Sequence, residues 1–170
     1  YRLKIDVEIN FVDGSITIRD NAGGIDQNKY EYAFRAAEIP DDTSGLNEFG
    51  MGMKTASSWL ANKWIVTTSA FGEDFQRTIE FNVDEVVSNN LLELEADERP
   101  CDSNIHFTTI KLEELTGNAP QQGHVNKIIK HLSSIHRKFI LNHNIEITVN
   151  EEVLEFEQQK ILKSPKWNDE

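Results

Sequence analysis

Cysteine is nearly absent from this sequence, in which Cys101 is the only one among 170 residues. A single thiol cannot form an internal disulfide, so we expect a reducing compartment and predict a cytoplasmic location. Long apolar runs are absent too, since no window approaches the length of a membrane-spanning helix, which needs about 18 consecutive apolar residues. The first residues alternate polar with apolar side chains instead of forming a signal-peptide core. We therefore expect neither a membrane segment nor a targeting signal.

Basic residues are also few, because 17 Lys and Arg stand against 29 Asp and Glu and leave a net charge of −12. Such a surface repels phosphate backbones and anionic membranes unless its basic residues cluster. We expect no nucleic-acid binding by this segment alone. With 38% hydrophobic residues and no repeat or long linker, the chain favours one domain. We predict that domain over 1–157, with 113–157 as its closing helix-and-strand extension and 158–170 as a tail or linker.

Hydrophobic periodicity predicts a chain that mixes strands and helices. Alternating apolar residues favour an antiparallel hairpin made of 2–9 and 15–19, which ends at Asp20. Further strands are expected at 64–68, 75–81, 91–96, 104–112, 145–149 and 153–156. Helical spacing predicts helices over 26–37, 50–60 and 125–141, the first with Asp26 as its N-cap. The segment 39–45 has turn formers and few apolar residues, so we expect a surface loop that acts as a lid over a ligand.

The first of two glycine clusters follows the predicted hairpin and reads Asp20-Asn21-Ala22-Gly23-Gly24-Ile25. A carboxylate at the end of a strand can face a cavity, and glycines behind it leave room for a flat ring to approach the backbone. Asp20 would then accept a hydrogen bond from an exocyclic amine such as that of adenine. Taken alone, such a cluster is more often an ordinary strand-to-helix turn.

The second glycine cluster opens a predicted helix and reads Phe49-Gly50-Met51-Gly52-Met53-Lys54-Thr55. Glycine amides at a helix N-terminus favour phosphate oxygens, and Lys54 adds a positive charge there. The spacing differs from the Walker A pattern G-x-x-x-x-G-K-[ST], so a standard mononucleotide loop is excluded. Taken alone, Lys54 is as often a solvated helix residue, while Met51 and Met53 favour core or pocket lining over metal binding.

Both clusters, in this order and separated by a helix and a loop, resemble the GHKL superfamily of gyrase, heat-shock chaperone, histidine kinase and mismatch-repair ATPases, which also includes the MORC proteins. The first resembles the D-x-G-x-G box with Ala22 at the first glycine position, and the second resembles the glycine box of chaperone-like and MORC-like members. The resemblance implies an α+β two-layer α/β sandwich of the Bergerat type, with a mixed, mostly antiparallel sheet and helices on one face. It covers nearly the whole chain, loosely outside the two boxes.

The resemblance also implies which residues bind ATP. Asp20 would bind the adenine amino group, and the second box would wrap the phosphates, with Gly45 to Gly52 as the hinge and floor of the lid. The strand Phe107-Thr108-Thr109-Ile110-Lys111-Leu112 resembles the G-T-x-[IV]-x-L strand of the chaperone pocket, although Phe107 replaces its glycine. The full candidate set is Asp20, Asn21, Gly23, Gly24, Gly50, Met51, Gly52, Met53, Lys54 and Thr108.

The family's catalytic helix, E-x-x-x-[ND], precedes the first hairpin, and its glutamate activates water while its asparagine or aspartate holds magnesium. Glu8 and Asn10 cannot replace that pair, because they are two residues apart on an alternating strand. We therefore assign no catalytic residue and expect Mg only together with that helix. Because the hairpin starts abruptly, we expect the helix upstream of it rather than a degenerate binder.

Three hypotheses stay open. The first is an ATPase switch of the chaperone, mismatch-repair or MORC kind, in which nucleotide closes the lid and drives an ATP-dependent homodimer. The second is a histidine kinase catalytic domain, although the strands and helix after Leu112 are too extensive for it. The third is a nucleotide-sensing interaction module without catalysis.

Metal and acyl-transfer chemistry have little support in the sequence. His131 and His136 are five apart on a predicted helix and so lie on different faces, and Cys101 has no second thiol as a partner. Neither Cys101 nor Ser57-Ser58 belongs to a nucleophile motif. We expect no protein-only metal site.

Overall fold

Eight strands and five α-helices make up the part of the chain that the computed structural model describes, residues 2–34, 52–89 and 95–157. The strands are β1 Leu3–Asn10, β2 Ser15–Asp20, β3 Ala61–Ser69, β4 Phe75–Asn82, β5 Asp97–Pro100, β6 Phe107–Leu115, β7 Ile145–Val149 and β8 Glu152–Val153. The helices are α1 Gln27–Phe34, α2 Gly52–Leu60, α3 Val83–Asn89, α4 Val125–Ile135 and α5 Arg137–Leu141, with a short 3-10 helix at Gln122–His124. None of the described helices is long and apolar enough to cross a membrane.

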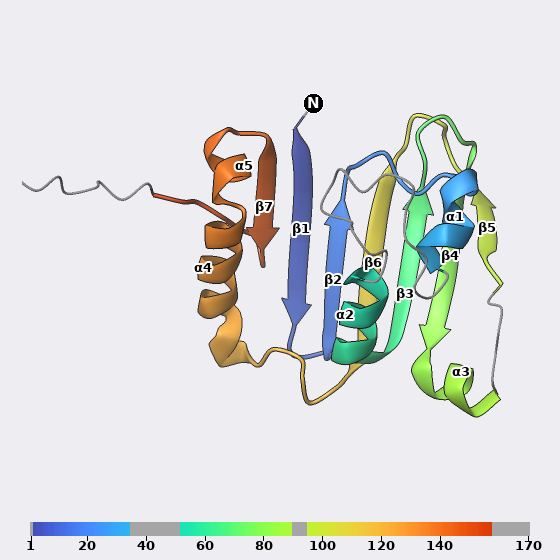
Figure 1. Cartoon of the computed structure of the whole chain (residues 1–170), viewed down its shortest axis with the longest axis horizontal. Helices are drawn as coiled ribbons and strands as arrows, with labels where there is room; N and C mark the ends of the chain where they lie inside the picture. Colours follow the sequence, from blue (N-terminus) through green and yellow to red (C-terminus); the bar gives the residue numbers. More distant parts are fainter. Residues whose placement is uncertain (1, 35–51, 90–94, 158–170) are drawn as a thin grey trace, which may run out of the picture.

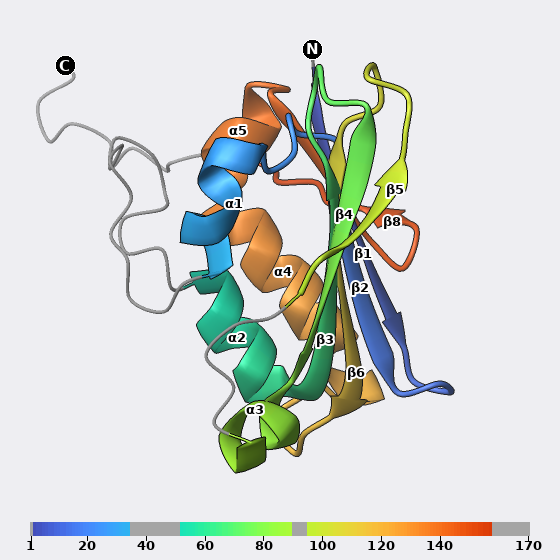
Figure 2. The ribbon, with the colours of Figure 1, turned by 90° about the vertical axis from the view of Figure 1, so that its right-hand side faces the viewer.

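The strands form one mixed sheet in the order β5-β4-β3-β6-β2-β1-β7-β8. Every neighbouring pair is antiparallel except β1 and β7, which run parallel with Leu3 opposite Ile145 and Val7 opposite Val149. The helices lie on one face of this sheet (Figure 1, Figure 2). The predicted two-layer α+β sandwich with a mostly antiparallel sheet is confirmed.

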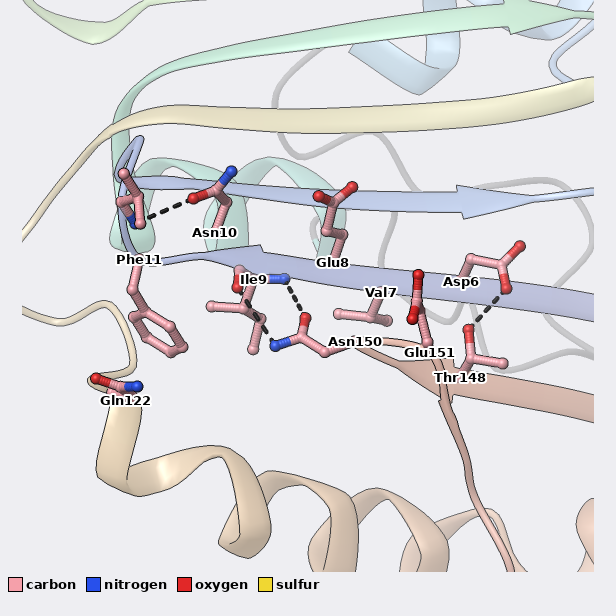
Figure 3. A pocket seen from close by; sticks show the side chains of 11 residues that line it. Asp6, Val7, Glu8, Ile9, Asn10, Phe11, Gln122, Thr148, Asn150 and Glu151 are labelled. Atoms are coloured by element: carbon pink, nitrogen blue, oxygen red, sulfur yellow. Dashed lines mark hydrogen bonds between the residues drawn. The ribbon is translucent and has the colours of Figure 1, made fainter.

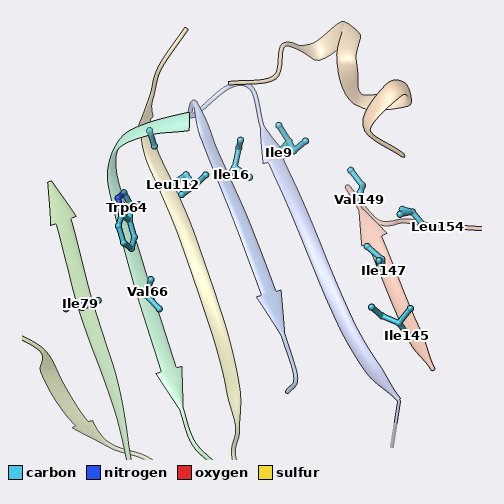
Figure 4. Close-up of a cluster of buried hydrophobic side chains, with 11 residues drawn as sticks. Ile9, Ile16, Trp64, Val66, Ile79, Leu112, Ile145, Ile147, Val149 and Leu154 are labelled. Atoms are coloured by element: carbon cyan, nitrogen blue, oxygen red, sulfur yellow. The ribbon is translucent and has the colours of Figure 1, made fainter. Parts of the chain in front are cut away.

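The buried core lies between the sheet and the helices because strand residues alternate between the two faces. Trp64 of β3 is fully buried, and its ring stacks on Phe81 of β4 with the ring centroids 4.4 Å apart. Figure 4 shows the buried cluster along the strands, which comprises Ile9, Ile16, Ala61, Trp64, Val66, Ile79, Leu112, Ile145, Ile147, Val149 and Leu154. The apolar stripe of α4 packs on this cluster through Val125, Ile128, Ile129 and Leu132. The alternation that predicted the strands therefore also places the core.

Two elements at the β4 edge differ from the sequence prediction. The strand expected at 91–96 is found instead as β5, Asp97–Pro100, while 91–94 lie outside the described residues. All four β5 residues are exposed, so pairing with β4 defines the strand without any apolar pattern. Helix α3 was not predicted, but its start carries a signal, because the Asn82 side chain accepts the Glu85 N–H at 3.2 Å as an N-cap does.

The C-terminal elements are shorter than predicted. The helix expected over 125–141 is divided into α4 and α5 at His136, whose ψ of 7° departs from helical geometry. The last strand, expected at 153–156, ends at Val153, although the Leu154 N–H still donates to Ile147 O at 2.8 Å. The predicted lid at 39–45 and the end of the first predicted helix lie outside the described residues.

Candidate nucleotide-binding site

A row of polar side chains crosses the helix-facing side of the sheet. Cross-strand register places Asp20 opposite Thr108, Thr108 opposite Thr68, Thr68 opposite Arg77, and Arg77 opposite Glu98. The next row on the same face is entirely apolar and comprises Ile18, Ile110, Val66 and Ile79. Polar groups on the buried side of a sheet need partners or a ligand, so the part of this row formed by Asp20, Thr108 and Thr68 marks the candidate site, whereas Glu98 at its other end is exposed.

Asp20 ends β2 at one end of this row and is half-buried. Its Oδ1 accepts the backbone N–H of Ala22 at 2.9 Å. Burial raises the pKa of Asp20 above its ordinary 3.8, and backbone hydrogen bonds from Ala22 and Thr108 partly offset that rise. The structure thus places a half-buried carboxylate beside the glycine turn, and its role as the acceptor for an adenine amine stays a prediction.

We predict that the wild-type chain loses stability relative to Asp20→Asn as pH rises. The raised folded-state pKa means that the folded state holds the Asp20 proton more tightly than the unfolded chain does. Its stabilising contribution is therefore complete below pH 3.8 and is lost as pH rises through the folded-state pKa. Denaturant unfolding of both proteins between about pH 3 and pH 7 measures this difference, and a pH-independent difference would contradict it.

Thr68 and Thr108 form the centre of the row. The Thr68 side chain is 1% exposed, and its Oγ1 lies 3.2 Å from Thr108 Oγ1 and 3.0 Å from Phe107 O. The same oxygen accepts the N–H of Ile25 at 2.9 Å, so the hydroxyl binds the first glycine cluster to β3. Thr108 was predicted for the site, whereas Thr68 was missed, because a threonine in a strand is ordinary β-former composition.

The turn after Asp20 fits tightly against the end of β3. Gly24 has φ +74°, and a Cβ on it would overlap Ser69 O and lie 2.8 Å from Ala70 Cα. Gly23 is open on its Cβ side, and its carbonyl accepts the Phe71 N–H at 3.1 Å. Position 24 therefore requires glycine, both because of its positive φ and because the turn lies so close to the β3 backbone. Neither reason applies at Gly23.

Asn21 is engaged with β1. Its Oδ1 accepts the Lys4 N–H at 2.7 Å and its Nδ2 donates to Arg2 O at 3.3 Å. The side chain thus extends the pairing of β1 and β2 past Asp20. The structure gives Asn21 a role in shaping the turn.

Helix α2 carries the described part of the second glycine cluster. It begins at Gly52 and has no acidic residue in its first turn, so no carboxylate within the described helix opposes the positive end of its dipole. Met53 packs on the core and Lys54 is half-buried, while Gly50 and Met51 lie outside the described residues. Leu60 continues into Ala61 of β3 without a loop, and α2 lies along the sheet with its N-terminus toward the end where β2 stops (Figure 1).

A hollow of about 740 Å³ lies elsewhere, at the far end of β1 (Figure 3). Its charged lining residues are the acidic Asp6, Glu8 and Glu151, and Asn150 there accepts the Ile9 N–H at 2.7 Å. Carboxylates without a basic partner do not attract a triphosphate. This hollow is therefore not the nucleotide site.

Glu8 and Asn10 lie opposite Thr17 and Ser15 and face away from the helices. They are therefore on the wrong side of the sheet to act at the polar row, and they lie on a strand, as the sequence predicted. Within 2–34, 52–89 and 95–157 no group of three His, Cys, Asp or Glu side chains could hold a metal ion. The described residues thus supply no cluster of these side chains for magnesium.

Comparison with known proteins bears on this site. Residues 2–111 match the family described as histidine kinase-, DNA gyrase B-, and HSP90-like ATPase. No curated protein matches the chain. Among solved structures, the ATPase and transducer domains of DNA topoisomerase II from Balamuthia mandrillaris superpose with a TM-score of 0.64 and 13% identity, over 89% of this chain and 42% of that one.

The ATPase region of Saccharomyces cerevisiae topoisomerase II is also similar, with a TM-score of 0.56 and 11% identity over 91% of this chain and 43% of that one. The same region bound to ICRF-187 (dexrazoxane) superposes with a TM-score of 0.53 and 13% identity, again over 91% of this chain and 43% of that one. At these identities the likeness concerns the fold, and the chain spans less than half the length of these structures. The family match covers more than half of the chain and includes Asp20, both glycine clusters and Thr108. The chain therefore belongs to the histidine kinase-, gyrase- and HSP90-like (GHKL) ATPase family, as a GHKL-type ATP-binding domain.

Proposed function

We propose that this chain binds ATP and ADP with adenine at Asp20 and acts as a nucleotide-driven conformational switch. The observation that carries the proposal is the single polar row on an otherwise apolar sheet face, which begins at the half-buried Asp20 carboxylate. In the proposed binding mode the Asp20 carboxylate accepts a hydrogen bond from the adenine amine, and Thr108 lies next to Asp20 on the neighbouring strand. Gly23 and Gly24 keep the turn close to the base without side chains in the way.

The phosphates, in this proposal, lie at the N-terminus of α2. The residues that would hold them are Gly50, Met51, Gly52, Met53 and Lys54, through backbone amides, the helix dipole and one ammonium group. Bound ATP supplies a phosphoanhydride for hydrolysis, and magnesium and the general base come from the family's upstream helix. The output is a conformational change with an ATP-dependent homodimer, in the cytoplasm and of the chaperone-like or MORC-like kind.

Calorimetric titration tests the proposal. ADP and a non-hydrolysable ATP analogue, each with and without magnesium, are added to the longest soluble form of the protein. We expect dissociation constants in the micromolar range for both nucleotides, and tighter binding of the ATP analogue when magnesium is present. Absence of heat for both at millimolar nucleotide would refute nucleotide binding.

A module that senses nucleotide without hydrolysing it is the second candidate. The observation in its favour is that Glu8 and Asn10 face away from the polar row, so neither is placed as the general base. Phosphate release under saturating ATP separates the two candidates: turnover by the complete protein favours the ATPase switch, and binding without turnover favours the sensor.

A further inference from the structure

We propose that Glu73 and Arg77 are positioning residues for the adenine-binding turn. This inference rests on the proposed function and extends it to two residues that no family box includes. Arg77 occupies the fourth position of the polar row, two strands away from Asp20's neighbour Thr108, and is only 4% exposed. Its guanidinium donates through Nη1 to Glu73 Oε2 and through Nε to Glu98 Oε1, each at 2.9 Å.

Glu73 connects this guanidinium to the helix that follows the turn. While its Oε2 binds Arg77, its Oε1 accepts the backbone N–H of Gln27 at 2.9 Å. Gln27 is the first residue of α1, and the glycine turn ends two residues before it. The Glu73 carboxylate thus connects the N-terminus of α1 to β4. The dipole of α1 also favours a negative charge at this N-terminus.

The turn and the start of α1 have three successive anchors, one on β3 and two on the connection between β3 and β4. Gly23 O accepts from Phe71 N, Ile25 N donates to Thr68 Oγ1, and Gln27 N donates to Glu73. The first two anchors come from residues fixed by the sheet or its tight turn. The third is the longer side chain of Glu73, and Arg77 is the group that holds this side chain in place.

The described residues use only part of the hydrogen-bonding capacity of this cluster. Arg77 Nη2 and the hydroxyl of Tyr30, on α1, are both buried without a hydrogen-bond partner among the described residues. The guanidinium carbon lies 5.3 Å from the Tyr30 ring centroid and 4.2 Å from that of Phe75. Buried charge with unmet hydrogen bonds is commonly no more stable than apolar packing of the same volume. A role in holding α1 and the turn in place accounts for the buried Arg77 guanidinium at this position.

The experiment compares two alanine variants that each remove one of the two ion pairs of Arg77. Glu73→Ala removes the pair that also binds α1, and Glu98→Ala removes the pair that does not. We expect nucleotide affinity to fall about tenfold in Glu73→Ala and to stay within about twofold of wild type in Glu98→Ala. Glu73→Gln retains an oxygen acceptor for the Gln27 N–H, and we expect it to restore part of the lost affinity.

A readout without nucleotide separates positioning from general destabilisation. Amide hydrogen exchange over 22–27 is expected to accelerate in Glu73→Ala, while exchange in β3 and β6 stays at the wild-type rate. Equal affinity of Glu73→Ala and wild type, or an equal loss in Glu98→Ala, would overturn the inference while leaving nucleotide binding intact. If wild type itself binds no nucleotide, the proposed function fails first, and the role of this pair in nucleotide binding fails with it.

Discussion

Asparagine in place of Asp20 is expected to abolish measurable nucleotide binding while the fold is retained. The carboxylate offers acceptors on both oxygens, one of which binds the Ala22 N–H. An asparagine that keeps its oxygen on this backbone donor turns an amide NH₂ toward the adenine amine, so that two donors face each other. We expect an affinity loss of at least about 100-fold, measured by calorimetric titration of ADP.

The fold of the Asp20→Asn variant is expected to be at least as stable as wild type near neutral pH, because burial already disfavours the charged form of Asp20. Asp6→Asn is the matched control: the same substitution is made on the neighbouring strand, but Asp6 lies opposite Arg19 and faces away from the helices. Its affinity should equal that of wild type. Retained affinity in Asp20→Asn would refute the adenine assignment.

Alanine at Gly24 is expected to displace the turn and to lower both stability and affinity. The φ of +74° is strained for alanine, and its Cβ would lie 2.6 Å from the Ser69 carbonyl carbon and 2.8 Å from Ala70 Cα, both backbone atoms that cannot rotate away. We expect the free energy of unfolding to fall by about 2–4 kcal/mol, measured by denaturant unfolding. Nucleotide affinity should fall with it, because the displaced turn is the one that follows Asp20.

Gly23→Ala controls for this substitution within the same turn. Nothing lies within 4 Å of a Cβ built on Gly23, and its φ is not in the left-handed region. We expect its unfolding free energy to stay within about 1 kcal/mol of wild type. If both alanine variants lost the same stability, close packing of Gly24 on β3 would not be the cause.

Sequence periodicity predicted the sheet well where strands alternate apolar and polar residues, as β1, β2 and β7 do. It missed what depends on pairing between strands. The exposed sequence of β5 has no apolar face and is a strand only because β4 lies beside it. Arg77, in a strand of mixed composition, has the sequence signature of a surface charge, yet register places it in the buried row.

Some residues of the candidate site were likewise predicted from the sequence, and others were not. Asp20 and Thr108 were predicted from motifs, and the structure brings them together as cross-strand neighbours. Thr68 and Glu73 belong to no motif, because their positions follow from how the β3–β4 connection meets the turn. Gly50 and Met51 lie outside the described residues, so the phosphate half of the site stays a prediction.

No loop separates α2 from β3, so the distance between the start of α2 and the end of β3 is fixed. Secondary structure runs unbroken from Gly52, at the expected phosphate end, to Ser69, beside the expected adenine end, and reverses only at the fully buried Ala61. A stretch without slack holds its two ends at a set spacing. Only a ligand long enough to reach both ends contacts both. A nucleoside triphosphate can therefore respond to the position of α2 relative to the sheet, whereas a free base or nucleoside contacts one end alone.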